Sequence, residues 1–346
     1  MNQDKVAVPV QIAPVKKHSI QKIIGYLIAL ACLVWVFHDV HVGEVLKTMT
    51  RINWWWIPLA VMFDILSYSS QGLRWKYVLH PLGKISALKT TQAIYAGLFA
   101  NEILPLRIGE LVRMYLVSRW MSVRLVLIIP SLVVERFFDG IWLALFIGLA
   151  ALFVPLPKRL LEAEEILGVI VIAVTALFVY LIFRKEKSIS EQEKASSKAR
   201  WKLLRLISTF IERLAIGIRD IGVSRYFYLA LAVSSLILIF QIIAFWLVMW
   251  AYGIHLNIWA GAVILLIVHF GTAIPNAPSN VGTFQFFTVV GLSLFNVEKT
   301  IATGFSIAVF VILTVPLWVI GLFAIGRTGM SLSTIRNEIR KLRMHE

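Results

Sequence analysis

Long apolar segments without charged side chains recur along the chain and predict membrane-spanning helices. A helix needs about 20 mostly apolar residues to cross a bilayer. The clearest uncharged runs are residues 23–37, 166–183 and 300–326, and residues 226–297 are long enough for several membrane segments. Further spans are expected at about residues 54–73 and 125–154, although each contains acidic side chains.

Two of the apolar regions, about residues 88–120 and 257–297, are interrupted by helix-breaking residues. The expected hinge residues are Pro105 and Gly109 in the first region and Pro275, Pro278 and Gly282 in the second. Non-helical backbone at membrane depth persists only where protein buries it or where it lines a wet cavity. We therefore predict that each region is a re-entrant hairpin and that the two breaks meet at one central site.

The positions of Lys and Arg predict the orientation of the chain. If both termini and the loops at 74–89, 107–124 and 184–225 are cytoplasmic, most of the Lys and Arg residues lie on that side. The opposite side then holds only Lys47, Arg51, Lys158, Arg159 and Lys299. This alternation requires about six full spans and two hairpins that enter from opposite sides. The predicted fold class is thus an all-α polytopic membrane protein with a candidate inverted repeat.

The sequence divides into a membrane domain and two cytoplasmic tails. We expect a tail at 1–19, a transmembrane domain at 20–330 and a basic tail at 331–346. The first apolar run lacks a small-residue cleavage site after it, so it is expected to be a retained helix. Residues 184–225 form a basic cytoplasmic loop, and from Trp201 onward its apolar side chains follow helical spacing. This spacing predicts either an interfacial helix on anionic lipid or a solvated connector.

Composition excludes most soluble functions. Of the 346 residues, 59% are hydrophobic and 15% are charged, and the mean hydropathy is +0.81. The net charge of +15 therefore indicates a membrane surface and no nucleic-acid partner. The single cysteine, Cys32, excludes an internal disulfide and a thiolate metal cluster. Since nucleotide-binding and hydrolase motifs are also missing, no cofactor, metal or coupled ATPase is expected.

Charged residues are unusually dense in the segment NEILPLRIGELVR, residues 101–113. It contains Asn101, Glu102, Arg107, Glu110 and Arg113 within an otherwise apolar region. The planar arginine guanidinium group suits a phosphate, so these side chains are candidates for binding a phospholipid headgroup. The alternative is that the arginines and glutamates pair with one another and only anchor the hairpin.

A second charged motif, VVERFFDG, lies within an expected span. Glu135 and Asp139 are four residues apart and share a helix face, while Arg136 projects elsewhere. Two acids in a span need counter-charges. We expect a network that joins Arg107 or Arg113 to these acids and leaves one cation for a ligand; a purely structural ion-pair cluster is the alternative. A carboxylate without a cation would be a candidate proton carrier.

The second break supplies neutral polar side chains. Candidate binding residues there are Asn276, Ser279, Asn280 and Gln285. A half-helix starting after Gly282 would direct backbone N–H groups at the break, which again suits an anion. His269 is expected to be a packing residue. Asp64 is expected to face a cavity or to snorkel, and the alternative is a distant counter-ion.

The order of these motifs resembles the lysylphosphatidylglycerol synthase transmembrane-region family, also called flippase-like integral membrane proteins. The resemblance covers roughly residues 20–330. It rests on Asn101, Leu104, Pro105, Arg107, Gly109, Glu110 and Arg113, then Glu135, Arg136 and Asp139, and then the late PNAPSNVGTFQ. In the best-known members this unit is fused to a soluble aminoacyl-transfer domain and moves the charged lipid across the bilayer. The resemblance thus implies a stand-alone flippase-like unit.

The third motif departs from the family pattern. The family commonly has Pro-Gly-Gly-x-Gly-x-x-Glu where this chain has residues 278–285, which end in Gln285. Loss of the final acid removes a partner for a cationic headgroup, so a neutral or anionic lipid is expected in place of a lysyl lipid.

Three functions are compatible with these features. The first is a translocator in the inner or plasma membrane that moves a lipid or lipid-linked headgroup between leaflets without ATP hydrolysis. The second is a membrane-embedded lipid transferase with Glu110, Glu135 or Asp139 as general base. The third is a scaffold for a lipid-modifying or glycan-assembly enzyme. Expected partners are a membrane lipid as substrate, anionic lipid at the cytoplasmic face, and either a lipid-modifying enzyme or a second copy of the chain.

Overall fold

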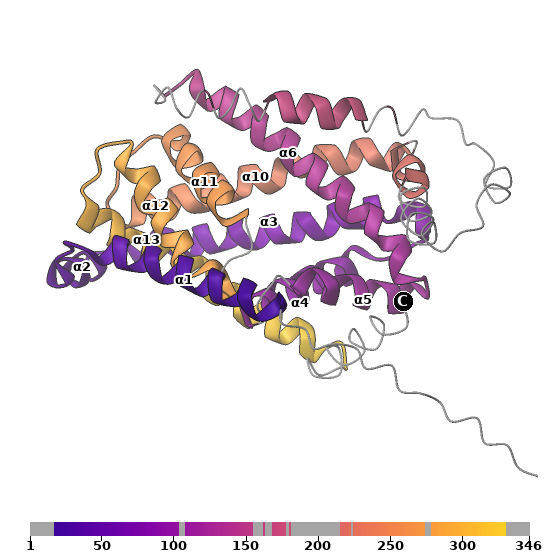
Figure 1. Cartoon of the computed structure of the whole chain (residues 1–346), viewed down its shortest axis with the longest axis horizontal. Helices are drawn as coiled ribbons and strands as arrows, with labels where there is room; N and C mark the ends of the chain where they lie inside the picture. The colour runs from indigo at the N-terminus through magenta and orange to yellow at the C-terminus, as the bar shows by residue number, and fades with distance from the viewer. Residues whose placement is uncertain are drawn as a thin grey trace, which may run out of the picture.

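Helices make up all the regular structure of the described residues. A computed structural model describes residues 17–103, 108–154, 162, 168–177, 180, 215–222, 224–273 and 278–329. Within these ranges α3 and α10 lie side by side at the centre, α4 and α5 lie along one side of them, and α6 runs diagonally across the view (Figure 1). The predicted all-α class is confirmed.

The helices begin and end where local sequence favours it. In chain order they are α1 (Lys17–Phe37), α2 (Val42–Met49), α3 (Ile57–Val78), α4 (Ala87–Ile103), α5 (Gly109–Met121), α6 (Ile129–Ala151), α10 (Arg225–Ala251), α11 (Ile258–Ala273), α12 (Thr283–Ser293) and α13 (Lys299–Gly326). Pro58 and Pro130 occupy the first turns of α3 and α6, where a backbone N–H is not needed. The Ser224 side chain accepts a hydrogen bond from the Tyr226 backbone N–H and caps α10.

Two helices, α10 and α13, meet both the length and the composition of a membrane span. The pair Ile24–Phe37 and Val42–Met49 is bent by 87° and gives a third candidate. Helices α3 and α6 have 22 and 23 residues, which is long enough to cross, but both carry charged side chains. The expected span at 166–183 is described only at residues 168–177 and 180. The count of six full spans therefore stays a prediction.

Contacts between helix ends define two ends of the bundle. At one end, the His80 ring stacks on Tyr226, 3.7 Å between centroids, and Gln92 Nε2 donates to the carbonyl oxygen of Ala324. We call this the basic end because the nearby connections and helix ends carry Lys84, Arg124 and Arg327. The beginning of α10, the beginning of α4 and the ends of α3 and α13 therefore lie together there.

At the opposite end, α10 finishes where α3 begins. The backbone N–H of Asn53 donates to the carbonyl oxygen of Ala251 at 2.8 Å, and Lys299 Nζ donates to that of His38 at 2.8 Å. The 3₁₀ turn Trp54–Trp56 next to this end exposes three indole rings. Exposed tryptophans are typical of a membrane–water interface.

The two interrupted regions form opposed helical hairpins. Helices α4 and α5 pack together and share the basic end, whereas α11 and α12 pack together and share the opposite end. Each of these helices has 11 to 17 residues and is too short to cross the hydrocarbon core alone. The hairpins meet at their tips, where Ser279 Oγ donates to the carbonyl oxygen of Glu102 at 3.1 Å.

The order of elements is that of an inverted repeat. The unit α3–(α4/α5)–α6 begins at the opposite end, and α10–(α11/α12)–α13 begins at the basic end. Contacts between the units are reciprocal, because α4 packs on α13, α11 packs on α6, and α3 packs along α10. Units of this kind are related by a pseudo-twofold axis in the membrane plane.

Glycines allow the close approaches at both hairpins. A Cβ atom on Gly97 would lie 2.7 Å from the carbonyl oxygen of Gly109, and one on Gly109 would overlap the backbone of Gly97. Gly282 has φ +90° and packs against the carbonyl of Ala29 in α1. The hinge roles expected of Gly282 and Gly109 stay predictions; in the structure Gly109 lets α4 and α5 touch.

Three of the other structural predictions fall wholly or largely outside the described residues. They concern hinge residues Pro105 and Pro275 and the amphipathic segment that starts at Trp201, of which residues 215–222 are described as helix. Pro278 begins the 3₁₀ turn η4 (Pro278–Asn280), in which Ser279 and Asn280 both have positive φ.

We expect Gly109→Ala to destabilise the protein by about 1–3 kcal/mol, because the added methyl group cannot be accommodated between α4 and α5. Thermal unfolding in detergent measures the effect. Gly43→Ala is the matched control, since a methyl group added to Gly43 would meet no atom within 4 Å. Equal melting temperatures for the two variants would contradict the close packing.

The opposed hairpins predict opposite accessibility of their connections. In a variant with Cys32 replaced by serine, Ser122→Cys should react with impermeant maleimide from the basic side only. Glu298→Cys should react from the other side only. Labelling of both from one side of sealed vesicles would refute the opposed arrangement.

Candidate functional site

A cluster of six charged side chains lies between α3, α5 and α6. It contains three arginines and three acids: Arg74, Arg113, Arg136, Glu110, Glu135 and Asp139. Asp139 is the eleventh residue of α6, so it lies about 15 Å from the beginning of that helix at 1.5 Å per residue. Half of a hydrocarbon core is about as thick. Arg74 precedes the last residue of α3 by four positions, about 6 Å, so the cluster extends from near the basic end toward the middle of the bundle.

Glu135 is the buried centre of the cluster. Its side chain is 2% exposed, and its Oε2 accepts a hydrogen bond from Arg113 Nη2 at 2.8 Å. Its other oxygen, Oε1, lies 3.8 Å from Nη2 of the buried Arg74. Removing either arginine would leave a buried charge without its full compensation.

Asp139 and Arg136 form the accessible edge of the cluster. Arg74 Nη1 donates to Asp139 Oδ1 at 2.5 Å, and Arg136 Nη2 donates to Glu110 Oε1. Arg136 also lies 3.8 Å from Asp139 across one helical turn. The side chains of Arg136 and Asp139 are 58% and 43% exposed, so a positive and a negative group are presented side by side.

Neighbouring residues hold Arg113 in position. The Arg113 guanidinium lies 4.8 Å from the ring centroid of Trp75, and Trp75 Nε1 donates to Ser131 Oγ at 3.0 Å. At the hairpin, the backbone N–H of Gly109 donates to Asn101 Oδ1 at 2.7 Å. Asn101 thereby holds the first turn of α5, which carries Glu110 and Arg113.

Two polar atoms of the cluster keep unused hydrogen-bonding capacity. Arg74 Nε and Glu135 Oε1 are buried and have no hydrogen-bond partner among the described residues. Such atoms are costly unless water or a ligand satisfies them. The cluster is therefore suited to bind a further polar group.

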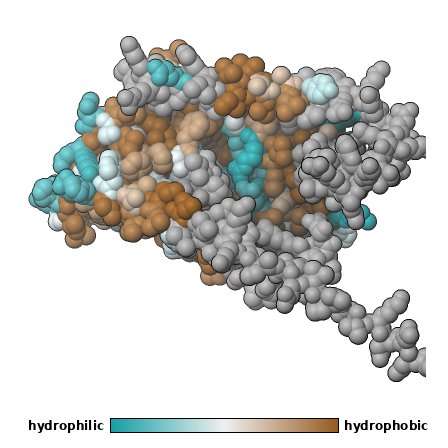
Figure 2. All heavy atoms as spheres, viewed as in Figure 1, coloured by the Kyte–Doolittle hydropathy of each residue, from teal (hydrophilic) through white to brown (hydrophobic). Residues whose placement is uncertain are grey.

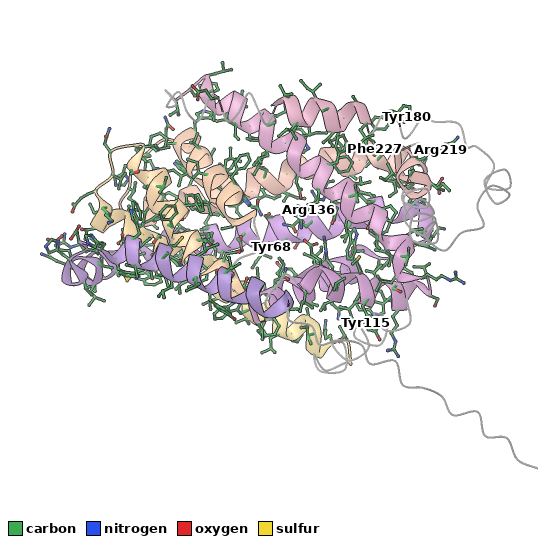
Figure 3. The ribbon with its side chains drawn as sticks, in the orientation of Figure 1. Tyr68, Tyr115, Arg136, Tyr180, Arg219 and Phe227 are labelled. Atoms are coloured by element: carbon green, nitrogen blue, oxygen red, sulfur yellow. The ribbon has the colours of Figure 1, made fainter. Side chains whose placement is uncertain are left out.

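A cavity of about 460 Å³, which we call the first cavity, adjoins the cluster. Its lining includes all six charged residues together with Asn101, Gly109 and Ser234. Hydrophilic atoms lie in the middle of a largely hydrophobic face (Figure 2). Figure 3 places Arg136 near the middle of the molecule, whereas Tyr115 lies nearer the basic end. Volumes of 300–1,000 Å³ are typical of small-molecule sites.

A second cavity of about 180 Å³ lies next to the hairpin tips. Its polar lining includes Asp64, Tyr68, Glu102, Ser279 and Asn280. Asp64 precedes Arg74 by ten residues of α3, which corresponds to about 15 Å along the helix axis. The second cavity is therefore displaced toward the opposite end of the bundle.

The two cavities share part of their walls. Gln241, His269 and Thr272 line both of them. A polar group that moved from one cavity into the other would pass these side chains. The imidazole Nε2 of His269 is buried and has no hydrogen-bond partner among the described residues.

The structure places the predicted site residues in three groups. Asn101, Glu110, Arg113, Glu135, Arg136 and Asp139 line the first cavity, and Ser279 and Asn280 line the second. Gln285 is buried outside both lining sets, and its Oε1 accepts a hydrogen bond from the Gly282 N–H at 2.7 Å, so it caps α12. Arg107 and Asn276 lie outside the described residues. The predicted pairing of Arg113 with Glu135 is observed.

Each described arginine of the cluster has a carboxylate partner, and Arg107 lies outside the described residues, so the expectation that one cation is left for a ligand stays a prediction. Sequence analysis also missed Arg74, which was assigned to a cytoplasmic loop. Helix α3 continues to Val78, and Arg74 is only 4% exposed. Glu135 and Asp139 lie one turn apart in α6 and together require more than one cation. This requirement is the signal in the sequence that could have identified Arg74.

The ion pairs should differ strongly in their contribution to stability. We expect Arg113→Gln to destabilise the protein by about 3–5 kcal/mol, because it leaves the buried Glu135 without its hydrogen-bonded partner. Arg136→Gln should cost about 1 kcal/mol or less, since its pair with Glu110 is exposed. Thermal unfolding in detergent compares them, and equal losses would contradict the buried role of Glu135.

Comparison with known proteins identifies the family of the chain. Residues 22–321 match the family described as the lysylphosphatidylglycerol synthase TM region. The chain is 24% identical over 306 residues to the UPF0104 membrane protein MJ1595 of Methanocaldococcus jannaschii, an alignment that covers 85% of this chain and 89% of that protein. No solved structure matches significantly. The chain is thus an integral membrane protein that belongs to the lysylphosphatidylglycerol synthase transmembrane-region family.

Proposed function

We propose that this protein moves the polar headgroup of a phospholipid or lipid-linked molecule between membrane leaflets without ATP hydrolysis. The observation that carries the proposal is the first cavity, in which paired charges are accessible at the level of the helix middles. A headgroup needs such a polar environment to leave the membrane–water interface, whereas the acyl chains of the lipid can remain against the hydrophobic outer surface of the protein.

The neighbouring cavities supply a route for the headgroup. The first cavity lies toward the basic end, the second lies toward the opposite end, and both are bounded by Gln241, His269 and Thr272. Two inverted units could expose these cavities alternately by moving against each other. We propose that the basic end is cytoplasmic, as the distribution of Lys and Arg predicts.

Charge balance in the first cavity favours a zwitterionic or anionic headgroup. The three arginines can donate to a phosphate, and Glu110 and Asp139 are only partly buried and can accept from an amine or hydroxyl group. The alternative transferase function needs a carboxylate that accepts a proton. All three candidate bases, Glu110, Glu135 and Asp139, are paired with arginine.

In proteoliposomes that contain a fluorescent phospholipid, the protein should accelerate exchange between leaflets. Glu135→Gln should reduce the rate at least about tenfold, because the substitution removes an ion pair that holds the cluster in place. A loss of about 1.4 kcal/mol in the free energy of headgroup binding already corresponds to a tenfold effect. Dithionite quenching of outer-leaflet probes gives the rate. Arg119→Gln is the control, because Arg119 is exposed on the same helix as Arg113 and lines neither cavity.

The assay also separates the alternative functions. Conversion of the lipid without exchange between leaflets would support a transferase. Neither conversion nor exchange by the wild-type protein, across zwitterionic and anionic lipids, would contradict both activities and favour a scaffold. Equal rates for Glu135→Gln and wild type would show that the charged cluster is not the translocation site.

A further inference from the structure

The carboxylate of Asp64 is buried in α3 without a partner among the described residues. Its residue is 5% exposed, and no hydrogen bond or ion pair joins it to any described residue. All three acids of the charged cluster, in contrast, are within reach of an arginine. An isolated carboxylate at such depth is very costly, so it needs a positive charge that the described residues do not supply.

The helices around the second cavity place acidic and neutral side chains, but no cationic ones among the described residues, near Asp64. The titratable side chains near it are Tyr68 of α3, Glu102 of α4 and His269 of α11, and the ring of Tyr95 of α4 packs edge-to-face against Tyr68. Helices α10, α12 and α13 contribute only uncharged side chains to the lining, and the lining contains no Lys or Arg among the described residues. The described lining of the second cavity is therefore acidic, whereas three arginines balance three acids in the first.

Helix ends add to this negative environment. Helices α4 and α11 end at Ile103 and Ala273, and their last turns contribute Glu102 and Thr272 to the lining of the second cavity. The carbonyl end of a helix carries a partial negative charge. In transporters with broken helices, such half-helix ends commonly face the coupling cation.

We propose that the second cavity is a binding site for a monovalent cation, either a proton or Na⁺, and that Asp64 is its anionic ligand. A proton from water would convert the carboxylate to the neutral acid, whereas Na⁺ would be held by the carboxylate and neighbouring oxygen atoms. The cation neutralises Asp64 and allows the carboxyl group to stay buried.

The shared wall couples this site to the first cavity. Gln241, His269 and Thr272 border both cavities, so a change of charge at one site acts on the polar groups at the other. The cation is thus the coupling ion for headgroup movement. This coupling step rests on the proposed function, whereas cation binding does not.

Binding is tested on the purified full-length protein. Infrared titration detects a protonated carboxyl group, and ²²Na⁺ binding detects the alkali ion. One of the two signals should be present in the wild type and reduced at least about tenfold in Asp64→Asn, which keeps the side-chain shape. The control is Asp39→Asn, which replaces an exposed acid outside both cavities.

The infrared band and the ²²Na⁺ binding together identify the cation and test the proposed site. A carboxyl band lost in Asp64→Asn identifies a proton, and lost ²²Na⁺ binding identifies Na⁺. Absence of both signals in the wild type, or an unchanged signal in Asp64→Asn, overturns the site. If Asp64→Asn does not fold, Asp64→Glu takes its place and should shift the band or the Na⁺ affinity; no shift overturns the site.

Coupling is tested in proteoliposomes with an imposed gradient. With one cation moved per lipid, a tenfold gradient of the identified ion can hold the labelled lipid at up to about a tenfold excess in one leaflet. The wild type should build such an asymmetry and Asp64→Asn should not. Lipid exchange without a response to the gradient overturns coupling, whereas absence of all lipid exchange refutes the proposed function and leaves the binding result intact.

Discussion

Compensation of buried charge is the constraint on which this structure depends. Glu135 is almost fully enclosed, and it remains tolerable there because Arg113 from α5 donates to it and Arg74 from α3 lies nearby. These contacts join α5 and α6, which follow one another in the sequence, to the earlier helix α3. The same contacts position Asp139 and Arg136 at the accessible edge of the first cavity, so stability and access to the site have one physical origin.

Broken helices are the second requirement of this architecture. Short helices that end within the membrane leave backbone groups that lipid cannot satisfy. Here the tips of the two hairpins meet each other, and Ser279 Oγ donates a hydrogen bond to the carbonyl oxygen of Glu102. Within the first hairpin, Asn101 Oδ1 accepts a hydrogen bond from the backbone N–H of Gly109. Small residues at Gly97 and Gly109 bring α4 and α5 close enough to make these contacts.

The two adjoining cavities differ in charge. Three arginines and three acids line the first cavity, whereas the described lining of the second contains acids and hydroxyl groups but neither Lys nor Arg. Within the described lining, guanidinium groups that could donate to a phosphate are therefore confined to the first cavity. The proposed coupling depends on the common wall between the cavities.

The sequence by itself determined the membrane class, the positions of both breaks and the charged motifs, because long apolar runs, prolines and clustered charges are local features. It also indicated that Arg107 or Arg113 would pair with Glu135 or Asp139, since acids in a span require cations, and the pair that the structure describes is Arg113 with Glu135. The cap that Gln285 forms on α12 is a contact between residues three apart, so it too is a local feature. Only the tertiary structure decided that Arg74 belongs to the cluster and that Asp64 has no partner among the described residues. Those two facts depend on which helices lie next to one another, and packing between distant segments leaves no local pattern in the sequence.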